Sequence, residues 1–193
     1  MENVVVHPVA AAIKERRTVR AFKEEPVSKE LIAELLELSA WAPNHKLREP
    51  WRFIAFFDEG REVLKQAIMQ VPKPKPMPGG HPHKHGKRGP VPCQIVVVVS
   101  ESAQPKEREE DYAATCALIQ NFQLAAWEVG LGVTWVSASF IRANEFKEGI
   151  GVTEDEKVVA LLNVGYPENV PAPLERQSIE QKLTIIDRAL IQD

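Results

Sequence analysis

The sequence contains little cysteine, no glycine-rich phosphate-binding loop and no long hydrophobic run. Its two cysteines, Cys93 and Cys116, lie in apolar surroundings and lack metal-ligand or redox spacing, which indicates buried thiols in a reducing compartment. Neither GxGxxG nor GxxxxGKS occurs, which argues against a Rossmann or P-loop nucleotide site. Apolar runs such as IVVVV at 95–99 are far too short to span a bilayer, and MENVVVHP lacks the basic region of a signal peptide. We therefore expect a cytoplasmic protein, neither exported nor embedded in a membrane.

The net charge also excludes some partners. With a formal charge of -3 and a pI near 6.0, the overall field does not favour nucleic acid or an anionic membrane.

The chain has 193 residues and is 44% hydrophobic, enough for a substantial core. No repeat is visible, so residues 1–193 are predicted to form one domain. Only the Pro- and His-rich segment at 72–92 differs in composition, and it is predicted to be a loop or lid.

Hydrophobic periodicity predicts alternating strands and helices, which is typical of an α/β or α+β protein. QIVVVVSE at 94–101 is expected to be a central strand covered on both faces. Further strands are expected at 51–58, 134–139 and 158–166. Helices are expected at 8–17, from Ser28 to Trp41, at 61–71, 112–129, 143–150 and 178–190.

The motif RRTVRAF at 16–22 places three arginines around one hydroxyl. Guanidinium groups this close repel one another unless solvent or an anion neutralises them, and their geometry matches phosphate oxygens. Arg16 and Arg20 would supply charge, Thr18 a hydroxyl, and Phe22 would pack the segment into the core. The alternative is a solvated charged face.

The second motif, WAPNHKLREPWRF at 41–53, joins a helix to a strand. One interpretation is structural: Pro43 and Pro50 fix a loop, Asn44 caps it, and both tryptophans are core. The other is that Asn44 and His45 place polar groups beside the large aromatic surfaces of Trp41 and Trp51. That arrangement suits a flat heteroaromatic ligand such as a flavin ring.

In the third motif, AAWEVGLGVTWVSAS at 125–139, two glycines separate a buried helix from a strand. They either simply end the helix or let the backbone approach a ligand closely, with the amides of Trp135 and Val136 facing it.

HPHKHG, with His81, His83 and His85 in alternation, could hold a divalent metal. Zinc sites usually recruit ligands from separate ordered elements, so a solvated cationic lid is favoured and no metal is predicted.

Together these motifs make the chain resemble the FMN-dependent nitroreductase family, in particular its shorter bacterial members. The resemblance is carried by the order and spacing of RRTVRAF, WAPNHKLREPWRF, IQNFQLAAWEVGLGVTW and VVALLNVGYPENVPAPLERQ. It implies an α+β fold, a three-layer α/β/α sandwich with a mixed, mostly antiparallel central sheet. It also implies a homodimer with two FMN molecules at the subunit interface.

The resemblance further implies which residues bind FMN. Arg16, Arg17, Thr18 and Arg176 correspond to contacts with the phosphate and ribityl chain, and Arg20 to a cation near the pyrimidine edge of the ring. The loop residues, expected from the partner subunit, are Trp41, Pro43, Asn44 and His45. The residues expected on the opposite side are Thr134, Trp135 and Val136.

The implied activity is a ping-pong transfer of reducing equivalents from NADH or NADPH through FMN to a nitroaromatic or quinone-like acceptor, with no protein nucleophile. Two alternatives stay open. One is an FMN-binding protein without this activity: a flavin carrier, a flavin-fragmenting enzyme or a dehydrogenase. The other is a non-catalytic module that binds metal or an acidic partner.

Overall fold

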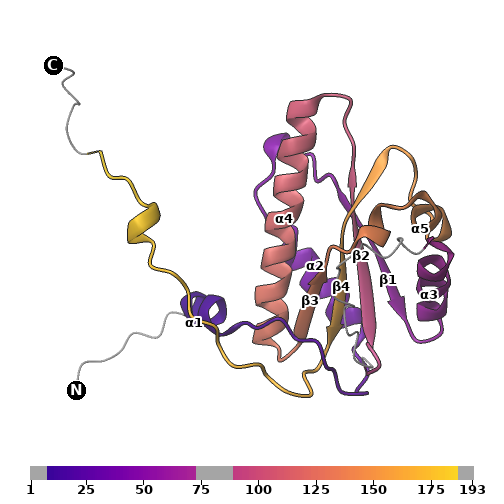
Figure 1. The fold of residues 1–193 in the computed structure, drawn as a ribbon, viewed down its shortest axis with the longest axis horizontal. Coiled ribbons are helices and arrows are strands. Elements are labelled where there is room, and N and C mark those ends of the chain that lie inside the picture. The colour runs from indigo at the N-terminus through magenta and orange to yellow at the C-terminus, as the bar shows by residue number, and fades with distance from the viewer. Residues whose placement is uncertain (1–7, 73–88, 187–193) are drawn as a thin grey trace, which may run out of the picture.

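A four-stranded antiparallel sheet forms the centre of the structure, which the computed structural model describes for residues 8–72 and 89–186 (Figure 1). The strand order is β1-β2-β4-β3, and all three strand pairs are antiparallel. Within the described residues, the parallel component of the predicted mixed sheet is a single bridge between Thr18 and Val133. The strands are β1 (Trp51–Phe57), β2 (Cys93–Ser100), β3 (Gly132–Val136) and β4 (Glu156–Gly165).

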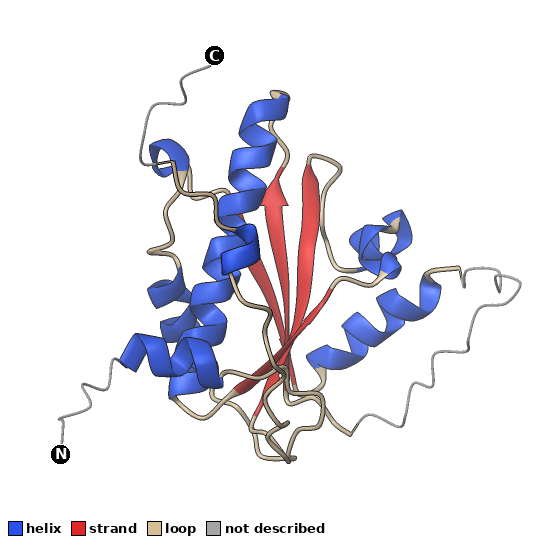
Figure 2. Ribbon diagram, turned by 60° about the vertical axis from the view of Figure 1, so that its left-hand side comes forward, coloured by secondary structure: helices blue, strands red, loops and turns tan. Residues whose placement is uncertain are grey.

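Helices cover both faces of the sheet (Figure 2). α2 (Lys29–Ser39) and α4 (Pro105–Glu128) pack on one face, while α3 (Gly60–Gln70) and α5 (Asn144–Gly149) pack on the other. α1 (Pro8–Glu15) lies against α4. The predicted α+β three-layer sandwich is therefore confirmed. Short 3-10 helices are found at His45–Leu47, Ser139–Arg142 and Glu180–Lys182.

Strand β2 separates two hydrophobic cores. Ile95 and Val97 pack toward α2 and α4, whereas Val96 and Val98 pack toward α3 and α5, and all four are fully buried. Because side chains alternate across a strand, an uninterrupted β-branched run satisfies both cores at once. The prediction of a central strand covered on both faces is correct.

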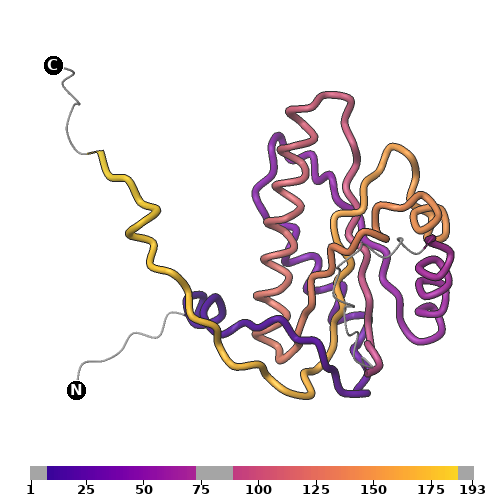
Figure 3. Tube along the Cα trace, in the orientation of Figure 1, coloured from indigo at the N-terminus to yellow at the C-terminus, as the bar shows by residue number. Residues whose placement is uncertain are grey.

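Helix boundaries at two places differ from those expected. α4 begins at Pro105, ahead of the predicted start at Tyr112, because its first two turns are charged and largely exposed and so carry no apolar signal. The expected helix at 178–190 is wrong where the structure describes it, since only one 3-10 turn forms before residue 187. Residues 168–186 are exposed and run away from the sheet (Figure 3), so their apolar side chains find no core within the described part of the chain.

Residues 73–88, which include most of the predicted lid, lie outside the described part of the chain. None of the helices in residues 8–72 and 89–186 is long and apolar enough to traverse a lipid bilayer.

Both cysteines are free thiols. Burial raises the pKa of Cys93 to about 12 and also raises the pKa of the half-buried Cys116.

Candidate functional site

The RRTVRAF segment lies along the open edge of the sheet. Val19 is completely buried and Phe22 is 4% exposed, so both anchor the segment in the core. The amide of Val19 donates to the carbonyl of Val133 over 3.2 Å, and the hydroxyl of Thr134 donates to the carbonyl of Val19. A Cβ at Gly132 would overlap the Val19 side chain. The close approach that Gly132 permits is therefore to this segment.

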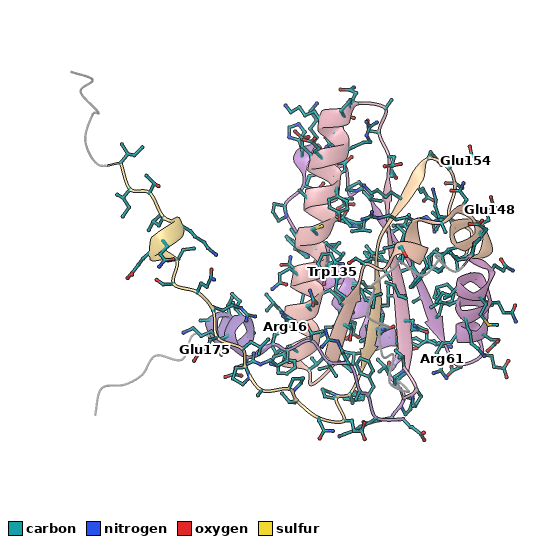
Figure 4. The ribbon with its side chains drawn as sticks, in the orientation of Figure 1. Arg16, Arg61, Trp135, Glu148, Glu154 and Glu175 are labelled. Carbon is teal, nitrogen blue, oxygen red and sulfur yellow. The ribbon has the colours of Figure 1, made fainter. Side chains whose placement is uncertain are left out.

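Arg16 lies at this edge, beside the C-terminal half of α4 (Figure 4). The Arg16 Nη1 donates to Gln123 Oε1 over 3.4 Å. Burial lowers the pKa of Arg16 below its usual value, and repulsion from Arg17 and Arg176 lowers it further. Three guanidinium groups from two distant parts of the chain therefore lie close enough to repel one another.

Two nitrogens of Arg17 have different surroundings: Nη1 contacts the end of α1, and Nε has no partner in the described residues. Its Nη1 donates to the carbonyls of Lys14, Glu15 and Arg16 at 2.7 to 2.9 Å, which satisfies the otherwise unpaired end of α1. Its Nε is buried and has no hydrogen-bond partner within residues 8–72 and 89–186. Because a buried donor without an acceptor costs about 1 to 3 kcal/mol, this atom indicates a place for an additional acceptor.

Within the described residues, none of the site arginines, Arg16, Arg17, Arg20 and Arg176, forms an ion pair with a carboxylate. Thr18 is half-buried and Arg20 is exposed. A group of cations that lacks acidic partners and includes an unsatisfied donor fits a phosphate group chemically. We call Arg16, Arg17 and Arg176 the arginine cluster.

The three residues predicted on β3 differ in what their side chains can do. Thr134 is buried, and its hydroxyl is engaged by Val19, so it serves as an internal tether. Trp135 and Val136 are half-buried, and Trp135 packs against the core on the side of the sheet covered by α2 and α4. The indole is the largest partly exposed side chain that β3 offers.

The loop before β1 is strongly exposed. Trp41 is 85% exposed and Leu47 is 79% exposed, whereas Trp51 packs partly against the core. The structural interpretation of Trp41 as core is therefore wrong. Pro43 and His45 are exposed and Asn44 is half-buried.

The loop and the arginine cluster contact different parts of α4. Arg48 of the loop contacts Asp111, whereas Arg16 contacts Gln123. Twelve residues of α-helix separate these contacts, a distance of about 18 Å along the axis. The described chain therefore presents two separate groups of predicted site residues.

Gln123 and Arg48 are not singled out by the sequence motifs. Gln123 is buried among apolar residues of α4, and a polar side chain within an apolar helix face is the signal that could have identified it. Arg48 lies inside WAPNHKLREPWRF, but its acidic partner is 63 positions away and carries no local signal.

Within residues 8–72 and 89–186, no group of three or more His, Cys, Asp or Glu side chains is arranged to hold a metal ion. His81, His83 and His85 lie outside those residues, so the alternative of a metal site there stays a hypothesis.

Comparison with known proteins identifies relatives along most of the chain. The model of the nitroreductase family matches residues 13–166. YfhC of Bacillus subtilis, provisionally named an NAD(P)H nitroreductase, is 36% identical over 176 residues, which cover 89% of this chain and 91% of that protein. The 5,6-dimethylbenzimidazole synthase of Rhodospirillum rubrum is 29% identical over 182 residues and 83% of each chain.

Solved structures share the fold. A nitroreductase-like family protein from Bacillus cereus superposes with a TM-score of 0.82 at 40% identity, covering 96% of this chain and 99% of its own. A provisionally named nitroreductase from Desulfovibrio desulfuricans, solved with FMN, has a TM-score of 0.75 at 24% identity and covers 96% and 100%. The FMN- and NADPH-dependent nitroreductase NfnB from Sphigopyxis sp. has a TM-score of 0.75 at 18% identity and covers 93% and 99%.

Proposed function

Because the chain belongs to the nitroreductase family, we propose that it is an FMN-dependent oxidoreductase that transfers reducing equivalents from NADH or NADPH to a nitroaromatic or quinone-like acceptor. The observation that carries the proposal is the arginine cluster, which has no carboxylate partner among the described residues. The FMN complex of the Desulfovibrio relative and the name of NfnB support the same cofactor.

In this proposal the arginine cluster binds the terminal phosphate of FMN. Arg16 and Arg176 supply charge, the Nε of Arg17 supplies a donor, and Thr18 adds a hydroxyl beside them. The protein achieves with side chains what a glycine-rich loop achieves with backbone amides in other nucleotide sites.

We propose that the active unit is a homodimer with FMN at the subunit interface. The exposed loop and the arginine cluster are about 18 Å apart along α4, so a second subunit is the natural source of Trp41, Pro43, Asn44 and His45 at each site. Apolar side chains that are more than half exposed also extend over both ends of the described chain, which is typical of a surface that another subunit covers. They include Val9, Ile13, Val170, Leu174, Ile179, Leu183, Ile185 and Ile186.

FMN held by the arginine cluster would supply hydride chemistry at its N5, which would let the nicotinamide and the acceptor react in turn in the same pocket, a ping-pong scheme. The protein needs no nucleophile of its own and supplies orientation and charge. Arg20 is exposed beside the buried Val19, and we propose that it places a cation near the N1 and O2 edge, where negative charge develops. Trp41 and Trp135 offer flat apolar surfaces to the ring and to an aromatic acceptor.

The decisive experiment is an absorption spectrum of the purified protein, followed by NADH or NADPH oxidation with a nitroarene or a quinone. Protein that is yellow and bleaches with NAD(P)H, then regains colour with the acceptor, supports the proposal. Protein that stays colourless and does not bind added FMN would overturn it and would favour a binding module.

A second candidate function is favoured by one comparison. The Rhodospirillum relative is named a 5,6-dimethylbenzimidazole synthase and not a nitroreductase, so we retain the flavin-fragmenting enzyme as the alternative. Loss of the flavin itself during turnover, instead of a cycle of bleaching and recovery, would select this alternative.

A further inference from the structure

The loop from Trp41 to Glu49, here called the 41–49 loop, adopts a strained backbone. Lys46, Leu47 and Glu49 have positive φ values of 58°, 50° and 46°, in the left-handed region that L-residues rarely adopt. None of the three is glycine or asparagine. Such a conformation persists only where surrounding contacts hold it in place.

Two side chains within the loop supply those contacts. Asn44 braces the loop internally: its Nδ2 donates to the carbonyl of Ala42, and its Oδ1 accepts from the amide of Glu49 over 3.0 Å. Arg48 ties the loop to α4, because its Nε donates to Asp111 Oδ1 over 2.8 Å and its Nη2 to Glu110 Oε2 over 3.0 Å.

The tie to α4 is largely shielded from water. The Asp111 side chain is 6% exposed, and the Arg48 side chain is 21% exposed. The hydrogen bonds that Arg48 donates to Asp111 and then to Glu110 raise the pKa of Arg48, so it stays charged under all ordinary conditions. Because the guanidinium donates two hydrogen bonds to two carboxylates, it fixes the orientation of the Arg48 side chain as well as its distance from α4.

The loop that is held so firmly presents side chains that its own chain does not cover. Trp41 is 85% exposed, Leu47 is 79% exposed, and His45 is exposed between them. Ordering a loop before binding lowers the entropy lost when a ligand or partner arrives. The ion pair therefore holds the strained loop in one conformation, so that its exposed side chains form a surface before any partner binds.

We infer that Arg48 is a positioning residue: by gripping Asp111 and Glu110 on α4, it fixes the 41–49 loop so that Trp41 and His45 meet the flavin held by the partner subunit. The inference rests on the proposed function. It adds to the site a residue that contacts neither cofactor nor substrate and acts through the loop.

The first test is hydrogen exchange on the apoprotein, which requires no flavin. Arg48→Met should speed amide exchange within residues 41–50. The matched control is Arg52→Met, because Arg52 forms a similar forked pair with Glu156 on β4 and donates to Glu156 and Gly151, not to α4. It should leave the exchange of the 41–49 loop unchanged. Equal exchange of the loop in wild type and Arg48→Met would overturn the inference.

The second test measures the flavin. Arg48→Met should bind FMN about tenfold or more weakly, because freeing even one loop residue costs that much in conformational entropy. At saturating FMN, the visible circular dichroism of the flavin should change, since the ring environment changes, whereas Arg52→Met should keep the wild-type band. An unchanged band in Arg48→Met would refute the inference.

A third variant separates positioning from stability. Removing Arg48 alone leaves Asp111 buried without a cation, so the double variant Arg48→Met/Asp111→Asn removes that charge as well. It should recover thermal stability relative to Arg48→Met but keep the fast loop exchange and the altered flavin band. Recovery of the flavin band together with stability would show a merely structural role.

A wild-type protein that binds no FMN would refute the proposed function, whereas normal FMN binding with an unchanged Arg48→Met band would refute this inference alone.

Discussion

Replacing Glu156 by glutamine should remove an acid-sensitive part of the stability. Glu156 accepts two hydrogen bonds from the Arg52 guanidinium, one of them at 2.6 Å, and also accepts the amide and hydroxyl of Thr153 at 2.9 and 2.8 Å. Its side chain is 12% exposed. Chiefly through the hydrogen bond from Arg52, these contacts lower the pKa of Glu156 from 4.5 to about 2.

The sign and size of the effect follow from linkage. Since the folded pKa lies below the unfolded value, the stabilisation is fully present above pH 4.5 and is lost as pH falls toward 2. The full shift corresponds to about 3 kcal/mol, of which about 1.4 kcal/mol remains at pH 3. Because the Arg52 side chain is 41% exposed, solvent screening makes these values upper limits.

Urea unfolding of the wild type and Glu156→Gln, run at neutral pH and near pH 3, would measure this. The difference in unfolding free energy between the two proteins should shrink by about 2 kcal/mol between those conditions. Comparing the two proteins cancels the titration of other carboxylates. A difference that is the same at both pH values would show that the Glu156 pKa is not depressed.

Four further outcomes are expected. Arg16→Gln should weaken FMN binding by about tenfold to a hundredfold but leave riboflavin binding nearly unchanged, because riboflavin lacks the phosphate. Arg20→Ala should lower the reduction potential of bound flavin, since a cation near the ring stabilises the negative charge gained on reduction. Ending the chain before Val170 should produce a monomer in sedimentation experiments, because the exposed apolar residues that follow are removed. Under mildly alkaline conditions iodoacetamide should modify Cys116 well before Cys93, whose burial raises its pKa to about 12.

Each of these outcomes has a clear opposite. Equal losses of FMN and riboflavin affinity in Arg16→Gln would show that Arg16 does not bind the phosphate. An unchanged reduction potential in Arg20→Ala, with FMN retained, would show that Arg20 does not act on the flavin ring. A truncated chain that remains dimeric would place the subunit contacts elsewhere. Faster alkylation of Cys93, followed by mass spectrometry of the peptides, would contradict its burial.

The layered architecture could be predicted because its signals are local. The β-branched residues from Ile95 to Val99 specify a strand that serves two cores, and the expected helix start at Ser28 is the N-cap of α2, where Ser28 accepts a hydrogen bond from the amide of Leu31 over 3.2 Å. The anchoring of RRTVRAF by Phe22 was likewise visible, since an aromatic residue after a charged run has to be buried somewhere.

What the sequence did not predict depends on distant partners. The pairing of Arg48 with Asp111, and of Thr134 with Val19, joins residues 63 and 115 positions apart, for which no periodicity exists. The C-terminal segment failed as a helix for a related reason. Ile179, Leu183 and Ile186 have helical spacing in the sequence, but an amphipathic helix forms when a surface receives its apolar face, and the described part of the chain supplies none there.

Because α4 is one uninterrupted helix, its length restricts how this protein can vary in evolution. One inserted or deleted residue between Asp111 and Gln123 would turn one end relative to the other by about 100° and shift it by about 1.5 Å. The ion pair at one end and the guanidinium contact at the other could not both survive that rotation. Length variation should therefore be tolerated in the connecting segments and excluded from the middle of this helix.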